Sequence, residues 1–327
     1  IRAMRRALRV NGRDTGEIEA LLEADNEPPS VHLVALPGLG SLDAAIDDGA
    51  RPGDLVPDSA VSAGGDVHRI PGTREGVVRV QDAGSQLVAR VLAKAPVQDD
   101  AGRWADLCAG PGGKAALLAA LANERGATLL ANEVGEHRAD LVRNALAPVP
   151  EDAWQVRVGD ARDVPGAEPA RFDRVLVDVP CTGLGALRRR PEARWRRTPS
   201  DVGNLASIQR QLLDAALDVT RPGGVALYAT CSPHTAETHD VLQEVLDARG
   251  DVEVLDTAEL ARSAALPGAL DGERAVGHEV PGGGTSVQLW PHVHGTDAMF
   301  FAALRPAAHS VSYTHLTLPT TPSVSIS

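Results

Sequence analysis

Two of the chain's three cysteines follow apolar runs in the same way. Cys181 lies in "DVPCTG", at the end of the run "FDRVLVDVP", and Cys231 begins "CSPH", after the run "GGVALYAT". A lone cysteine in an apolar run is usually an inert core residue. Two cysteines at matching positions, each in a turn that contains proline, indicate instead that both thiols act on one substrate.

A pair of thiols beside a carboxylate suits methyl transfer to a pyrimidine. C5 of the ring is a poor nucleophile, but addition of a thiolate at C6 makes it an enamine-like carbon that attacks a methyl sulfonium. The C5 proton must then leave so that the thiol is eliminated, and a second acid/base group nearby assists this step. Asp178, three residues before Cys181, is placed to hydrogen-bond the N3/N4 edge of a cytosine.

A glycine-rich stretch, "DLCAGPGGK" (residues 106–114), follows a short apolar run and opens a helical pattern. Its glycines let a ligand approach the backbone, and the helix N-terminus offers free N–H groups. The spacing matches neither the P-loop nor the dinucleotide pattern G-x-G-x-x-G. We therefore expect a nucleoside without phosphates, S-adenosylmethionine (SAM), to be bound by Cys108, Ala109, Gly110, Pro111, Gly112, Gly113 and Lys114.

Acidic residues end the next three expected strands. Glu133 lies 23 residues after Gly110, where a carboxylate can accept both hydroxyls of a ribose. Asp160 and Asp178 end the third and fourth strands. One such residue is most often an ordinary turn residue, but the ordered set predicts that Glu133, Asp160 and Asp178 share the SAM-binding edge.

From about residue 77, strand-like runs alternate with helical patterns. This alternation predicts a doubly wound, mostly parallel α/β sheet. In the usual strand order of such sheets the fourth and fifth strands are neighbours, about 4.8 Å apart. Cys181 and Cys231 follow the carboxyl ends of these two strands, so both thiols are expected to face one cleft.

Composition narrows the class of protein. The cysteines have no C-x-x-C spacing, which argues against a zinc site or a disulfide framework and favours a reducing cytoplasm. No apolar stretch approaches the roughly 20 residues that cross a bilayer, and the basic start lacks the apolar core of a signal peptide. We expect a cytoplasmic monomer with no membrane contact, no metal and no obligatory protein partner.

A local basic strip stands out against the net charge of −12. The run "RRRPEARWRR" directly follows "PCTGLGAL", and arginine contacts phosphates through two N–H groups while an exposed tryptophan stacks on a base. A solvated basic loop is the alternative, but the place beside the expected cleft favours an RNA track. The residues assigned to RNA binding are Arg188, Arg189, Arg190, Arg194, Trp195, Arg196 and Arg197.

Three segments are expected along the chain. Residues 1–76 form a small α+β segment that binds RNA or serves as a linker, with a helix near 15–24 and a strand near 30–36. Residues 77–306 form the catalytic domain. Residues 307–327, which contain the Ser-, Thr- and Pro-rich tail "SVSYTHLTLPTTPSVSIS", are expected to be a disordered or artefactual extension.

The motifs "DLCAGPGGK", "DVPCTGLGALRRRPEARWRR" and "YATCSPHTAET", in this order, resemble the signatures of the Sun/Fmu (NSUN-type) family of RNA cytosine-5 methyltransferases. The arginine-rich run is most similar to the bacterial branch of that family typified by RsmB, which acts on 16S ribosomal RNA. "VQDAGSQLVARVL" resembles the segment before the family's catalytic domain, and "DAMFFAALRP" its last strand.

The resemblance implies a Rossmann-like SAM-dependent methyltransferase with a seven-stranded sheet. It makes Cys231 the nucleophile and Cys181 the residue that assists product release. The family motif often reads "CAAPGGK", so Gly110 stands where Ala is common. RsmB-type enzymes also carry an N-terminal helical domain that resembles NusB; no part of this chain resembles it, so we expect a truncated chain or a shortened relative.

Two alternatives remain open at this point. The RNA substrate is expected to be 16S ribosomal RNA, but the motifs equally suit transfer RNA or another ribosomal position. A non-catalytic RNA-binding or assembly factor on the same fold is the alternative outside enzymes. Two thiols at adjacent strand ends count against it, because binding alone requires neither.

Overall fold

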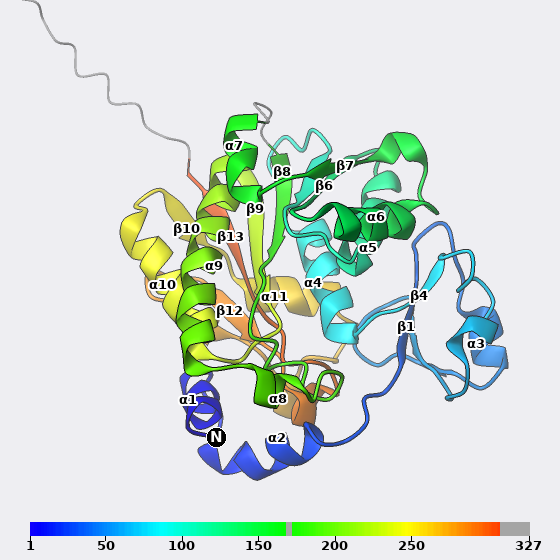
Figure 1. Ribbon diagram of the computed structural model, residues 1–327, viewed down its shortest axis with the longest axis horizontal. Coiled ribbons are helices and arrows are strands. Elements are labelled where there is room, and N and C mark those ends of the chain that lie inside the picture. Colours follow the sequence, from blue (N-terminus) through cyan, green and yellow to red (C-terminus); the bar gives the residue numbers. More distant parts are fainter. Residues whose placement is uncertain (168–171, 308–327) are drawn as a thin grey trace, which may run out of the picture.

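Two β-sheets organise the chain, a small one near the N-terminus and a large one that holds the site (Figure 1). The computed structural model describes residues 1–167 and 172–307. The predicted tail, residue 307 apart, lies outside the described residues. Within the described part of the chain, no helix is long and apolar enough to cross a membrane.

The N-terminal part combines two helices with a four-stranded sheet of order β2-β3-β1-β4. Helix α1 was not expected from the sequence; it buries Met4, Ala7 and Leu8 and leaves its arginines outside. The small sheet includes β4, which begins just after residue 76, the predicted end of the N-terminal segment. The boundary at residue 76 stays a prediction. The elements are α1 (Arg2–Val10), α2 (Ile18–Ala24), β1 (His32–Ala35), α3 (Asp43–Asp47), β2 (Arg51–Pro52), β3 (Ser59–Val61) and β4 (Val78–Val80).

The large sheet confirms the predicted mostly parallel α/β architecture. Its order among the described residues is β11-β12-β13-β9-β8-β5-β6-β7, with β10 also paired to β13. Strand β7 pairs with β6, β6 with β5, β5 with β8 and β8 with β9, all in parallel, and β13 is antiparallel to β9. The strands are β5 (Arg103–Asp106), β6 (Thr128–Glu133), β7 (Trp154–Val158), β8 (Phe172–Asp178), β9 (Thr220–Thr230), β10 (Val252–Val254), β11 (His278–Glu279), β12 (Thr285–Gln288) and β13 (Phe300–Pro306).

The expected count of seven strands is wrong, because the described residues give this sheet nine. Two short strands share the place beside β13: β12 pairs with Phe300 and Phe301, and β10 pairs with Leu304 to Pro306. Strand β11 extends the edge by a two-residue pairing with β12. Strands of two to four residues are too short to show an alternating pattern, which is why the sequence did not reveal them.

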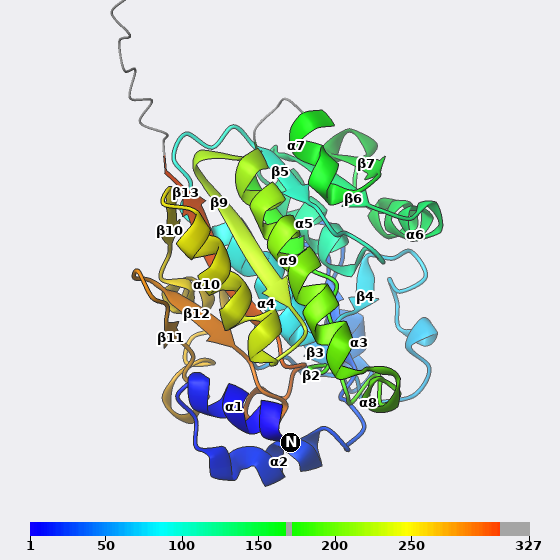
Figure 2. The same cartoon turned by 60° about the vertical axis from the view of Figure 1, so that its left-hand side comes forward.

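Helices cover both faces of the large sheet. Apolar side chains of α4, α5, α6 and α11 pack on one face, and those of α9 and α10 on the other. Figure 2 shows α9 and α10 in front of β9, with α4 behind it. The helices are α4 (Ala83–Lys94), α5 (Gly113–Asn123), α6 (Glu136–Leu146), α7 (Val164–Ala167), α8 (Ala193–Arg196), α9 (Pro199–Val219), α10 (His239–Ala248), α11 (Thr257–Ala264) and α12 (Pro291–His294).

Helix α9 begins at Pro199, six residues before Leu205, where the apolar pattern of the helix starts. Thr198 and Asp201 form a capping box, and Pro199 occupies the first turn, where its missing N–H costs no hydrogen bond. The first turns of α9 are mostly polar, so the apolar pattern that indicates a helix begins later in the sequence. The earlier start brings α9 close to α8 and the arginine-rich run.

Gly112 fixes the glycine turn against α6. Its φ is +108°, and a Cβ there would lie 2.4 Å from the Cβ of Ala145. Gly113 has no positive φ, and the Gln81 side chain, 4.0 Å away, is the nearest atom that its Cβ would meet. The turn therefore needs glycine at 112 but not at 113.

Gly112→Ala should lower the free energy of unfolding by about 3 kcal/mol, because the left-handed backbone and the crowded Ala145 both resist a Cβ. Gly113→Ala, the matched control, should change it by less than about 1 kcal/mol. Urea unfolding measures both. Equal losses in the two variants would show that the turn is not fixed by Gly112.

Asp106, the last residue of β5, is buried beneath the glycine turn and 1% exposed. Its carboxylate accepts a hydrogen bond from the N–H of Cys108 at 3.2 Å. Burial, reinforced by the negative charge of Asp178, raises the pKa of Asp106 to about 7.

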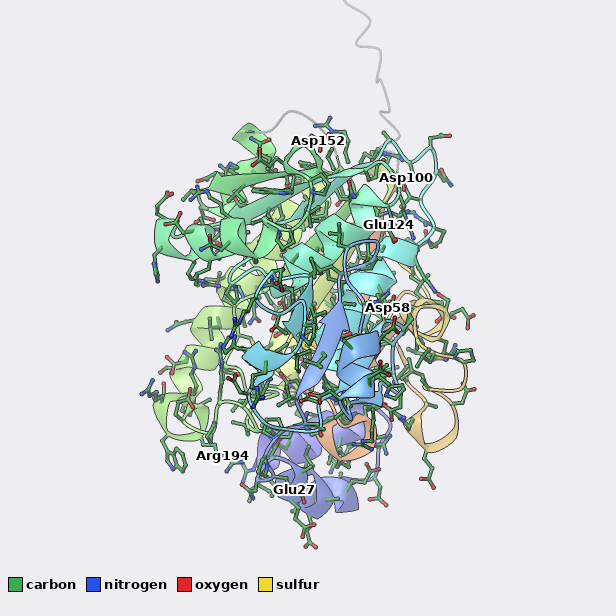
Figure 3. The ribbon with its side chains drawn as sticks, turned by 90° about the vertical axis from the view of Figure 1, so that its right-hand side faces the viewer. Glu27, Asp58, Asp100, Glu124, Asp152 and Arg194 are labelled. Carbon is green, nitrogen blue, oxygen red and sulfur yellow. The ribbon has the colours of Figure 1, made fainter. Side chains whose placement is uncertain are left out.

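Asp106→Asn keeps an oxygen for Cys108 but removes this titration. Since the pKa of the folded chain, about 7, lies above the ordinary 3.8, the wild-type group stabilises the fold at low pH, and this stabilisation is lost as the pH rises through 7. As the pH rises from about 5 to about 8, the free energy of unfolding of the wild type should therefore fall by about 2–3 kcal/mol relative to that of the variant. Urea unfolding at both pH values checks this, with exposed Asp152→Asn (Figure 3) as the control; parallel pH profiles of wild type and D106N would contradict it.

Candidate active site

The carboxyl ends of β5, β6, β7 and β8 meet at one edge of the large sheet, as parallel pairing requires. The glycine turn follows β5 and leads into α5, whose N-cap is Gly112. Within the turn, the N–H of Ala109 donates to the carbonyl of Asn132 at 2.9 Å. This bond ties the predicted SAM-binding turn, which includes Pro111, to the end of the neighbouring strand.

Glu133 ends β6 and points back to the turn. Its side chain is 3% exposed and accepts hydrogen bonds from the N–H groups of Gly110, at 3.1 Å, and Gly135, at 3.2 Å. Arg138 lies 3.3 Å from the same carboxylate. A Cβ at residue 110 would lie 2.1 Å from Glu133 Oε2, so glycine at this position allows the close approach.

Asp160 and Cys108 flank this edge with different environments. Asp160 follows β7 and pairs with Arg162, whose hydrogen bonds lower the pKa of Asp160. Cys108 is the third thiol, and burial raises its pKa well above the ordinary value, with Asp106 adding to the shift. Cys108 is therefore a neutral side chain at neutral pH and contributes packing rather than charge to the turn.

Lys114 and Asp178 form an ion pair that the sequence did not reveal. Lys114 lies in the first turn of α5 and Asp178 at the end of β8, and Lys114 Nζ is 2.8 Å from Asp178 Oδ2. Burial would lower the pKa of Lys114, but the charge of Asp178 outweighs it and raises that pKa. The ammonium group is therefore charged, and it orients the Asp178 carboxylate at the sheet edge.

The two predicted thiols lie in contact. Strands β8 and β9 are parallel neighbours, with Asp178 opposite Ala229, as the expected strand order requires. Cys181 Sγ and Cys231 Sγ are 3.3 Å apart. The N–H of Gly185 also donates to the carbonyl of Cys231 at 2.9 Å, which ties the turn after β8 to the turn after β9.

The contact between the two thiols shifts their pKa values in opposite directions. The hydrogen bond with Cys231 lowers the pKa of Cys181, and the hydrogen bond with Cys181, together with burial, raises the pKa of Cys231. Lys114 lies near Cys231 and favours negative charge on it. Deprotonation of the pair thus leaves one proton between two sulfurs, beside a cation.

Three arginines of the arginine-rich run bond to the rest of the fold, although Arg189 and Arg197 are also exposed. Arg189 pairs with the fully buried Asp297, and Arg188, whose side chain is 9% exposed, donates to the carbonyl of Gly295 at 3.1 Å. Arg197 donates to the carbonyl of Thr182 at 3.3 Å. Three of the predicted RNA-binding arginines therefore hold the turn after β8 in place.

The rest of the run faces outward. Arg190 and Arg196 are exposed, and Trp195 is 78% exposed. Arg194 reaches the N-terminal helices: it donates to Asn26 Oδ1 at 2.6 Å and to the carbonyl of Asp25 at 2.8 Å, at the lower edge of the molecule in Figure 3.

Two further features of this site escaped the sequence. Val134, directly after Glu133, is 65% exposed and offers an apolar surface beside the buried carboxylate. Glu237 lies 0% exposed between the two cysteine turns. A buried glutamate is unusual for its residue type, but only the fold reveals its burial.

This edge fits a nucleoside that lacks phosphates. Glu133 presents a buried carboxylate suited to ribose hydroxyls, Val134 an apolar surface for a base, and Gly110 to Gly113 a backbone open to close approach. The two cations near the turn, Arg138 and Lys114, are each paired with a carboxylate, Glu133 and Asp178, so neither is placed to hold a phosphate. Within the described ranges no group of three or more His, Cys, Asp or Glu side chains is arranged to hold a metal ion.

Solved structures share this fold. A methyltransferase homologue from Pyrococcus horikoshii superposes with a TM-score of 0.70 at 24% identity and covers 89% of this chain and 91% of its own. NSun6 from the same organism, crystallised with SFG, has a TM-score of 0.72 at 17% identity, covering 90% of this chain and 95% of that one. At these identities the likeness concerns the fold alone.

Sequence relatives are closer. A Mycobacterium tuberculosis protein named as a methyltransferase is 51% identical over 297 residues, which are 90% of this chain and 60% of that protein. Ribosomal RNA small subunit methyltransferase B of Erwinia tasmaniensis is 32% identical over 240 residues, 73% of this chain and 49% of that protein. The chain thus spans about half to three fifths of the length of these relatives.

The family described as 16S rRNA methyltransferase RsmB/F matches residues 91–305. This match covers well over half of the chain and includes the glycine turn, both thiols and the last strand. The chain therefore belongs to the RsmB/F family of SAM-dependent 16S rRNA methyltransferases.

Proposed function

We propose that this chain methylates C5 of a cytosine in RNA, with 16S ribosomal RNA as the substrate, through a covalent bond between Cys231 Sγ and C6. The observation that carries the proposal is the contact of the two sulfurs, 3.3 Å apart at the ends of adjacent parallel strands. RNA binding without chemistry would require neither thiol.

SAM, when bound, supplies an electrophilic methyl group carried on a sulfonium sulfur. The residues that would hold it are those of the glycine turn, 108–114, with Glu133 on the ribose and Asp160 at the next strand end. Val134 adds an apolar contact for the adenine. The carboxylates and backbone groups of this edge match the polar groups of a nucleoside.

Asp178 and Lys114 would hold the target base. The Asp178 carboxylate accepts a hydrogen bond from the cytosine N4 amino group, and Lys114, 2.8 Å from it, holds it in place. A base must leave its stack to reach this edge. Exposed Trp195, together with Arg190, Arg196 and the outer arginines of α1, offers stacking and phosphate contacts along the approach.

The thiol pair would perform the covalent steps. Cys181, which has the lower pKa of the two, loses its proton first, and its thiolate takes the proton of Cys231 as the Cys231 sulfur adds to C6. Once C5 carries the methyl group, the C5 proton must be removed. Cys181 then assists as the acid/base group: it releases its proton to solvent and takes the C5 proton, the C5–C6 double bond is restored, and the electron pair of the S–C6 bond returns to Cys231.

Cys231→Ser should reduce methyl transfer to an unmodified 16S rRNA transcript by at least about 10³-fold, because a hydroxyl lacks the nucleophilicity of a thiolate. The affinity for SAM, measured by calorimetry, should stay within about twofold of the wild type, because residue 231 lies outside the glycine turn. Filter binding of a labelled methyl group measures transfer. Activity that survives in C231S would exclude Cys231 as the nucleophile.

Cys181→Ala should accumulate a covalent protein–RNA adduct that withstands a denaturing gel, because solvent can take the Cys231 proton beside Lys114, so the bond to C6 forms but is not released. The double variant C181A/C231S is the control and should give no adduct. If C181A gives free methylated RNA at the wild-type rate, Cys181 has no part in release. Repeating the assay with a transfer RNA transcript distinguishes the alternative substrate.

A further inference from the structure

Glu237 is a buried carboxylate, 0% exposed, in the turn before α10. Both of its oxygens accept hydrogen bonds from the two cysteine turns. Oε1 accepts from the N–H of Thr182 at 2.8 Å, and Oε2 accepts from the hydroxyls of Thr182 at 2.5 Å and Ser232 at 2.6 Å. Thr182 directly follows Cys181, and Ser232 directly follows Cys231.

A third element strengthens this connection. Gln209 of α9 donates to Glu237 Oε1 at 3.2 Å and also to the carbonyl of Pro180 at 2.9 Å. The residues before and after Cys181 and the residue after Cys231 are therefore held by one carboxylate and one amide. On the other strand, the hydroxyl of Tyr228 donates to the backbone carbonyl of Glu237 at 2.7 Å.

Stability alone does not explain a carboxylate at this depth. Moving a carboxylate out of water costs several kcal/mol, and well-packed apolar side chains of similar volume often stabilise a fold as well or better. Hydrogen bonds to a charged acceptor are short and directional, so they fix geometry more tightly than apolar contacts do. The placement points to a requirement for precision between the two turns.

We propose that Glu237 is a positioning residue that holds the turns of Cys181 and Cys231 in register, so that their sulfurs stay within reach of one shared proton. This inference rests on the proposed function for its purpose. Its geometry can nevertheless be tested without RNA or SAM, because two sulfurs at 3.3 Å need only a small movement to reach the roughly 2.05 Å of a disulfide.

The first test measures the rate of closure, which is the formation of a disulfide between the two thiols. Diamide removes one hydrogen from each thiol and is itself reduced to the hydrazine, so Cys181 and Cys231 become a disulfide that peptide mass spectrometry identifies. Glu237→Ala should slow closure by about tenfold or more, because a displacement of about 1 Å between reacting groups costs one to two orders of magnitude.

Glu237→Gln separates hydrogen bonding from charge. Its amide oxygen can still accept from Thr182 N–H, and the two hydroxyls can accept from its NH₂ group. Closure should stay within about threefold of the wild type. Glu244→Ala and Glu244→Gln, on the exposed face of α10 with a side chain 53% exposed, are the matched controls and should not change the rate.

The second test links the position to the reaction. Single-turnover methylation by E237A should fall by at least the factor seen in closure, while the affinity for SAM and for RNA stays unchanged, and E237Q should restore most of it. A residue needed only for stability would lower all of these together. Should E237A fail to fold, Ser232→Ala and Thr182→Val each remove one hydroxyl and should slow closure in the same direction.

Wild-type closure in a folded E237A, or closure in E237Q as slow as in E237A, would overturn the positioning role. In the first case the turns hold their register without the side chain, and in the second the charge and not the hydrogen bonds matters. If closure follows the expected order but the wild type methylates no RNA, Glu237 keeps its role and the proposed function fails instead.

Discussion

The parallel pairing of β8 with β9 is the constraint on which the site depends. Asp178 lies opposite Ala229, so the turns that follow these strands start side by side and carry Cys181 and Cys231 into contact. A shift of one residue would turn each side chain to the other face of the sheet. Strand β9 is buried on both faces, with Leu227 in one apolar core and Tyr228 in the other, and these two cores fix the register.

Electrostatics then gives the two thiols different roles. They share one proton, Lys114 lies near Cys231, and Asp178 is held by that same lysine. The ion pair thus serves the sulfur and the base at once. Burial raises the pKa of Asp297. Its ion pair with Arg189 attaches the turn after β8 to the segment just before β13. The charged groups of the site are therefore also the ones that hold its loops.

Sequence patterns predicted the parallel core and the residues at its strand ends, because apolar strands, glycine turns and terminal acids are local signals. Contacts between side chains of distant elements were not predictable in the same way. The Lys114–Asp178 pair spans 64 residues and the bonds of Glu237 to Thr182 span 55. Arg188 and Arg189 belong to a run that looks like exposed charge, yet both lie near buried Asp297, and the Arg188 side chain is only 9% exposed.

The central claim is that Cys231 bonds to C6 of a cytosine, and an RNA carrying 5-fluorocytidine tests it most directly in the unaltered protein. Fluorine replaces the proton that must leave C5, so the enzyme cannot release the base and remains bound to it. Digestion and mass spectrometry then identify the attached residue. The account predicts a SAM-dependent adduct on the peptide that contains Cys231; an adduct on Cys181, or none at all, would contradict it.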